Sequence, residues 1–280
     1  VQAIVNIMMK RPEVIYHKLN ASTKHSAPAF FGFSDTYYET GNKNASLNLL
    51  AQHWYFHNDN ATITNFQQNT GYSKWRESER NWNAQNIYLA LYADWMCSLK
   101  DYLAFKATYV NNPSNYISEG KGHLNEEGQD IQHFTYFNED KVSYYINTYN
   151  LYYKHSFHPK PWLEAAARFN LNGNETKGVR TENYHSWDYQ NIYDFDNFRY
   201  SGGLEICYTT PIGKHTFDIG SETSFLNDRI RQVYAGYPTF NHKNMDEYLF
   251  AGLSGKLSPK FSYAFSVGYE MLFRKVAGVD

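Results

Sequence analysis

The chain has 280 residues, a formal net charge of −2 and a mean hydropathy of −0.66, yet it contains 26 tyrosines, 19 phenylalanines and six tryptophans. No stretch approaches the ~20 consecutive apolar residues of a membrane-spanning helix, two cysteines are too few for a disulfide-stapled scaffold, and a balanced charge without a long basic run disfavours nucleic-acid binding. What remains is an ordered β-protein, either a transmembrane β-barrel, whose alternating strands average to a polar composition, or a soluble β-sandwich.

Alternation of apolar and polar residues predicts strands along the whole chain. The clearest one covers 261–274, where Phe261, Tyr263 and Phe265 alternate with small or polar residues, and it exceeds the ~5 to 6 residues typical of soluble strands. The first two strands are the least regular because Pro12 and Pro28 interrupt the pattern. In chain order we expect strands at 13–23, 30–40, 44–56, 83–97, 101–111, 141–157, 162–172, 197–209, 215–227, 245–257 and 261–274.

The connections between these strands alternate in length. Short turns are expected at 41–43, 98–100, 158–161, 211–214 and 258–260, and long loops at 58–82, 112–140, 173–196 and 228–244. Outer-membrane barrels sort their connections in this way, with short periplasmic turns and longer extracellular loops. The predicted fold class is therefore all-β, an antiparallel meander of about eleven strands from a transmembrane outer-membrane β-barrel. Eleven is an odd number, so we expect a fragment of a larger barrel.

A short motif near the N-terminus points to a family. It reads Ala3-Ile4-Val5-Asn6-Ile7-Met8-Met9-Lys10-Arg11. This run resembles the last plug strand of TonB-dependent outer-membrane receptors, of the Bacteroidota type, and the strand series begins directly after it. The resemblance implies that residues 1–11 end a plug domain and that residues 12–280 form the first half of a 22-stranded barrel.

The resemblance also implies a function. It is that of a receptor and transporter in the outer membrane of a Gram-negative bacterium, which takes up a scarce nutrient with energy from TonB: an iron chelate, haem, cobalamin, a glycan or a peptide. The implied partners are outer-membrane lipid, the TonB complex, a small nutrient ligand and, as a further candidate, a surface lipoprotein. The alternatives are a passive porin, a surface adhesin or structural barrel, and an unrelated soluble β-protein. No short catalytic motif occurs, so we expect neither an enzyme nor a cofactor.

Candidate ligand-binding residues fall in the predicted long loops, where aromatic rings alternate with groups that hydrogen-bond or carry charge. Such mixtures suit polar ligands, and arginine forks suit anions. The alternative is an aromatic girdle at the lipid interface together with packing among loops and paired surface charges. The candidates are Trp75, Arg76, Arg180, Tyr184, His185, Trp187, Asp188, Tyr189, Arg229, Arg231 and Tyr234.

One predicted loop concentrates groups that bind metals. Between His123 and His133 it also contains Glu126, Glu127 and Asp130. Their spacing matches no established metal motif, so a solvated acidic loop is the favoured interpretation and no metal site is expected.

Overall fold

The computed structural model describes residues 13–26, 30–127, 129, 131–157, 161–232, 239–258 and 260–279. These residues form one antiparallel sheet in which each strand pairs with the next along the chain, and β1 and β11 are its edges. The all-β meander expected from the sequence is thus confirmed. No described segment is a helix long and apolar enough to cross a membrane. The strands are β1 (Tyr16–Ser26), β2 (Phe30–Gly41), β3 (Ala45–Asn69), β4 (Tyr72–Met96), β5 (Asp101–Glu126), β6 (Gln132–Ser156), β7 (Trp162–Tyr184), β8 (Asp188–Ile212), β9 (His215–Gln232), β10 (Thr239–Ser258) and β11 (Phe261–Val279).

The prediction of long loops was wrong. The segments 58–82, 112–140 and 173–196 are continuous with the strands on either side and form long hairpins with tight tips, such as Thr70 and Gly71 between β3 and β4. The segment 228–244 likewise extends β9 and β10, except for residues 233–238, which are not described. The expected plug strand, residues 1–11, also lies outside the described residues.

The register places one uninterrupted apolar row across the sheet. Because directly paired residues lie on the same face of a sheet, the pairs define a row that contains only apolar or tyrosine side chains and glycine. The row is Leu19, Tyr38, Leu49, Leu91, Ala107, Tyr149, Phe169, Gly202, Phe225, Met245 and Phe273. We call this side the apolar face.

The neighbouring row lies on the opposite side and is mostly polar. We call this side the polar face. Its members are Lys18, Glu39, Asn48, Tyr92, Lys106, Asn150, Arg168, Gly203, Ser224, Asp246 and Leu272. No second sheet covers the apolar face within the described chain, and Phe261, Phe265 and Tyr269 on β11 are 56%, 69% and 64% exposed.

The apolar face ends at a definite height on each strand. On β8 it runs from Phe198 to Tyr208, about 33 Å along the strand, or ~25 Å of height at the ~40° tilt of barrel strands. Beyond Phe198 the same face carries Asp196 and Asp194, which form ion pairs with Arg231 at 3.8 Å. Apolar positions thus give way to charged ones where the strands continue into the long hairpins.

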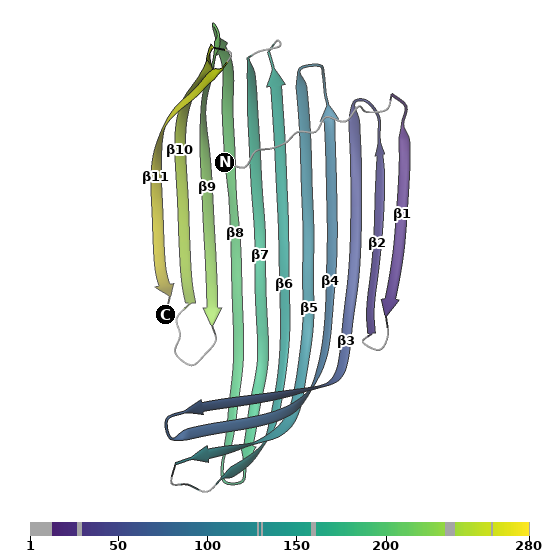
Figure 1. The fold of residues 1–280 in the computed structure, drawn as a ribbon, viewed down its shortest axis with the longest axis vertical. Coiled ribbons are helices and arrows are strands. Elements are labelled where there is room, and N and C mark those ends of the chain that lie inside the picture. Colours follow the sequence, from purple (N-terminus) through teal and green to yellow (C-terminus); the bar gives the residue numbers. More distant parts are fainter. Residues whose placement is uncertain are drawn as a thin grey trace.

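Two of the long hairpins bend sharply. Figure 1 shows the ends of β3, β4, β5 and β6 turning sideways at the bottom of the view and running across the ends of β7 and β8. Glycines allow this bend, because a Cβ at Gly122 would collide with the backbone carbonyl of Trp75 and with the ring of Phe134. The two hairpins are therefore brought against β7 rather than projecting straight away from the sheet.

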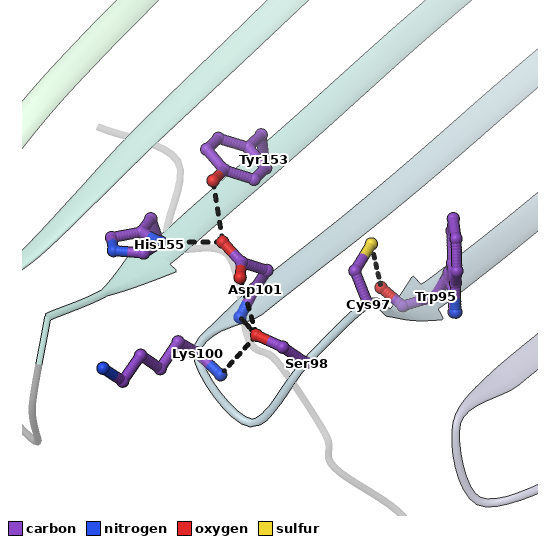
Figure 2. A network of polar contacts seen from close by, with 7 residues as sticks. All are labelled: Trp95, Cys97, Ser98, Lys100, Asp101, Tyr153 and His155. Carbon is purple, nitrogen blue, oxygen red and sulfur yellow. Dashed lines mark hydrogen bonds and ion pairs between the residues drawn. The ribbon is translucent and has the colours of Figure 1, made fainter.

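At the opposite ends of the strands the connections are short turns, as expected. At the turn between β4 and β5, the Asp101 carboxylate accepts hydrogen bonds from the Ser98 hydroxyl at 2.6 Å and from the Tyr153 hydroxyl at 2.8 Å, and it bonds the His155 ring at 2.7 Å (Figure 2). The backbone N–H groups of Lys100 and Asp101 donate to the Ser98 Oγ. This network ties the turn to β6.

Candidate functional site

The bent hairpins bring charged and aromatic side chains from three strands into one cluster on the polar face. We call these residues the hairpin cluster. They are Lys74 and Arg76 on β4, Phe134 and Tyr136 on β6, and Arg180, Glu182 and Tyr184 on β7, and within each strand they occupy alternate positions. Since β5 and β6 separate β4 from β7 in the sheet, contacts between Lys74 and Glu182 require the sheet to curl over its own polar face.

Hydrophobic burial concentrates at this cluster. Among the described residues, the buried hydrophobic side chains are Phe134, Tyr136, Tyr184, the adjacent Leu124, and Ala84 elsewhere on β4. A sheet with solvent or lipid on both faces has no other place for a core of its own. The cluster is therefore what fixes the position of the hairpins.

Glu182 is the anionic centre of the cluster, with only 2% of its surface exposed. Its carboxylate accepts hydrogen bonds from the Lys74 ammonium, from Arg180 Nη2 at 2.6 Å and from the Tyr184 hydroxyl at 3.0 Å. Burial alone would raise the pKa of Glu182, but the bonds from Lys74 and Arg180 outweigh it and the pKa lies below its ordinary value. The carboxylate is thus held ionised.

Cations also lie over the rings of the cluster. The Lys74 ammonium lies 4.8 Å from the centre of the Phe134 ring, and Tyr136 contacts two guanidinium groups, with Arg76 at 3.9 Å and Arg180 at 5.6 Å from its ring centre. Such contacts orient a cation without neutralising it. Burial lowers the pKa of Arg76, and the nearby positive charge of Arg180 lowers it further. Burial raises the pKa of Tyr136.

The structure brings four of the predicted residues together. Arg76, Arg180 and Tyr184 belong to the hairpin cluster, and the Trp187 ring stacks on Tyr184 with 4.0 Å between centroids and an interplanar angle of 11°. The Trp187 indole N–H also donates to the Gln132 side chain at 3.1 Å. The rings at the tip of the β7–β8 hairpin therefore close one side of the cluster.

The other predicted residues do not belong to the cluster, although Tyr189 lies beside it as the register partner of Glu182. Trp75 points to the opposite face, where it stacks on His123 at 5.3 Å, and Arg229 and Arg231 also lie on that face. His185 and Asp188 are exposed around the β7–β8 turn, Tyr189 is 41% exposed and pairs with Glu182, and Tyr234 lies outside the described residues.

Sequence reasoning missed Lys74, Phe134, Tyr136 and Glu182. Alternation inside the predicted loops was the available signal, since Lys74 and Arg76, like Arg180, Glu182 and Tyr184, occupy every second position. Their meeting across the sheet has no local sequence signature.

The predicted acidic loop forms the end of the β5–β6 hairpin. His123 and His133 are register partners, and their rings lie 6.2 Å apart. No group of three or more histidine, cysteine, aspartate or glutamate side chains in the described chain is arranged to hold a metal ion, and Asp130 is not described.

Comparison with known proteins identifies no relative: no protein-family model, no curated protein and no solved structure matches the chain.

Proposed function

We propose that the protein is an outer-membrane receptor that takes up a scarce nutrient with energy supplied by TonB. The observation that carries the membrane part of this proposal is the apolar row that crosses all eleven strands, with a polar row directly beside it on the other face. We call the part of the sheet that carries the apolar face the belt. An exposed apolar face suits contact with lipid, and the polar face suits a water-filled lumen.

The height of the belt supports the same proposal. Its ~25 Å on β8 equals the apolar band of outer-membrane barrels, and it is followed by Asp196, Asp194 and Arg231 on the same face. Charged side chains at that level are compatible with the aqueous side of the membrane and costly within it.

The receptor part of the proposal is supported by the long hairpins. Their polar face continues the lumen-facing side of the strands, and there the partly exposed side chains of Arg180 and Trp187 lie at the expected extracellular end. Coupling to TonB is supported by the resemblance of residues 3–11 to the last plug strand of such receptors.

The test is nutrient uptake in matched cells. Cells that express the protein are expected to accumulate its nutrient only when the TonB complex is intact, and a variant in which residues 3–11 are replaced by a Gly/Ser sequence should reach the outer membrane but not transport. Uptake that persists without TonB would identify a passive porin. Absence of the protein from the outer-membrane fraction would refute the membrane assignment.

A further inference from the structure

The arginines on the polar face of the hairpins have hydrogen-bonding capacity that the chain does not use. Among the described residues, neither Arg76 nor Arg80 forms an ion pair with a carboxylate. The Nε atoms of Arg76, Arg80 and Arg180 are buried and have no acceptor within the described chain. The terminal Nη groups of Arg76 and Arg80 form no ion pair with a described carboxylate, so these groups are free to bind an acceptor from outside the chain.

Tyrosine rings fix the orientation of these arginines. Arg76 lies 3.9 Å from the centre of the Tyr136 ring, and Arg80 lies 5.5 Å from the centre of the Tyr116 ring, which itself stacks on Trp82 at 5.4 Å. Each ring restrains its guanidinium group without accepting the N–H donors at the outer edge of that group. That edge is what grips a carboxylate bidentately.

The described carboxylates on the polar face of the hairpins do not form ion pairs with Arg76 or Arg80. Glu182 is engaged by Lys74 and Arg180. Asp140 accepts a hydrogen bond from the Asn138 amide at 2.7 Å through Oδ2, and its Oδ1 is buried without forming an ion pair with either arginine. Glu126 lies at the other end of the hairpin, opposite Tyr72 in the register. The side of the hairpin that follows Arg76 towards Arg80 therefore keeps a positive charge.

We infer that Arg76 and Arg80, together with Arg180, bind a small polyanion that carries at least two carboxylate groups. The two residues are four positions apart on one face of β4. They lie beside different rings, Tyr136 and Tyr116, so their guanidinium groups are two separate contacts and a ligand with two or more carboxylates can engage one at each. This inference rests on the proposed receptor function and names the class of its ligand.

The experiment is calorimetric titration of the protein in detergent with citrate, with raffinose as the neutral comparison. Arg76→Gln and Arg80→Gln should each weaken citrate binding about tenfold or more, because each removes a charge-assisted fork. Lys121→Gln removes one positive charge from the opposite face of the same hairpin region and should leave citrate binding unchanged. Arg76→Lys, which keeps the charge but loses the fork, should also weaken binding, and it guards against an Arg76→Gln variant that fails to fold.

The outcomes separate the ligand class from the receptor function. Citrate binding that is unchanged in both arginine variants, or lowered equally by Lys121→Gln, would overturn the inference. Binding of raffinose but not citrate would do so as well, while TonB-dependent uptake would still stand. An affinity for citrate that falls with added salt in the parent and far less in Arg80→Gln would support it.

Discussion

Replacing Glu182 by alanine is expected to free the β3–β4 hairpin from β7. Glu182 accepts hydrogen bonds from the Lys74 ammonium of that hairpin and from Arg180 and Tyr184 of its own strand. The substitution leaves the Lys74 ammonium among Phe134 and Tyr184 with no carboxylate beside it. A buried charge without its partner favours a conformation in which it returns to water.

The magnitude follows from burial. The side chains of Lys74 and Glu182 are only 15% and 3% exposed, and removing one partner of a buried ion pair costs about 3 to 5 kcal/mol. Since about 1.4 kcal/mol corresponds to a factor of ten, opening of the hairpin end should become on the order of a hundredfold more frequent or greater. The loss is local because the partners of Glu182, which are Lys74, Arg180 and Tyr184, all lie in the hairpins.

Hydrogen exchange followed by mass spectrometry in detergent measures this opening directly. Peptides from 66–76 should exchange much faster in Glu182→Ala, while peptides from 83–96 should be unchanged. Glu175→Ala is the matched control: this carboxylate lies on the same strand and is paired with Lys177, but the two side chains are 46% and 56% exposed, so its loss should cost about 0 to 1 kcal/mol. Equal exchange at 66–76 in the parent and in Glu182→Ala would refute the reasoning.

Three further predictions concern the rest of the sheet. Leu151→Arg on the apolar face of β6 should destabilise the protein in bilayers by about 2 to 4 kcal/mol, whereas Thr148→Arg on the polar face should be tolerated; equal effects in liposome folding titrations would contradict the assignment of the faces. Gly122→Ala should loosen the hairpin bend by about 1 to 3 kcal/mol, measured by exchange at 120–134, while Gly252→Ala, whose Cβ would meet its nearest atom at 3.6 Å, should not. Hydrogen bonds from His155, Ser98 and Tyr153 lower the pKa of Asp101 to about 2, so its stabilising contribution is complete above its ordinary pKa near 3.8 and disappears as the pH falls through about 2. Thermal unfolding of the parent and of Asp101→Asn should therefore differ at pH 5 and converge towards pH 2.

The half of each strand that carries the apolar face was predictable because apolar and polar residues alternate there without interruption. Positions such as Phe265 and Tyr269 on β11 must alternate with small or polar ones, and the turns around Ser98 and Gly213 carry typical turn residues. The outer halves of the strands, which form the long hairpins, could not be predicted from the alternation of apolar and polar residues. On β4, for example, Glu77 and Glu79 lie on one side and Arg76 and Arg80 on the other, so the alternation of apolar and polar residues is lost although the strand pairing continues.

The cluster residues were only partly predictable for a related reason. Arg76, Arg180 and Tyr184 were recognised by residue type, but the partners that hold them, Glu182 and Tyr136, depend on the curl of β4 over two intervening strands. Arg229 and Arg231 were grouped with them because loops were expected, whereas a continuous β9 fixes both on the opposite face. Face assignment needs the register, and the register of the outer halves was missing.

Because the belt and the hairpin cluster are separate, the belt and the hairpins should differ in what stabilises them. Within the belt, apolar side chains such as Leu151 and Phe225 are 44% and 39% exposed, so the described chain does not bury them. In the hairpins, Phe134 and Tyr184 are 3% and 7% exposed and are buried by the protein alone. Leu151→Arg should therefore impair bilayer folding without changing exchange at 66–76, and Glu182→Ala should do the reverse. If either substitution altered bilayer folding and exchange at 66–76 equally, the hairpins and the belt would have to unfold together as one cooperative unit.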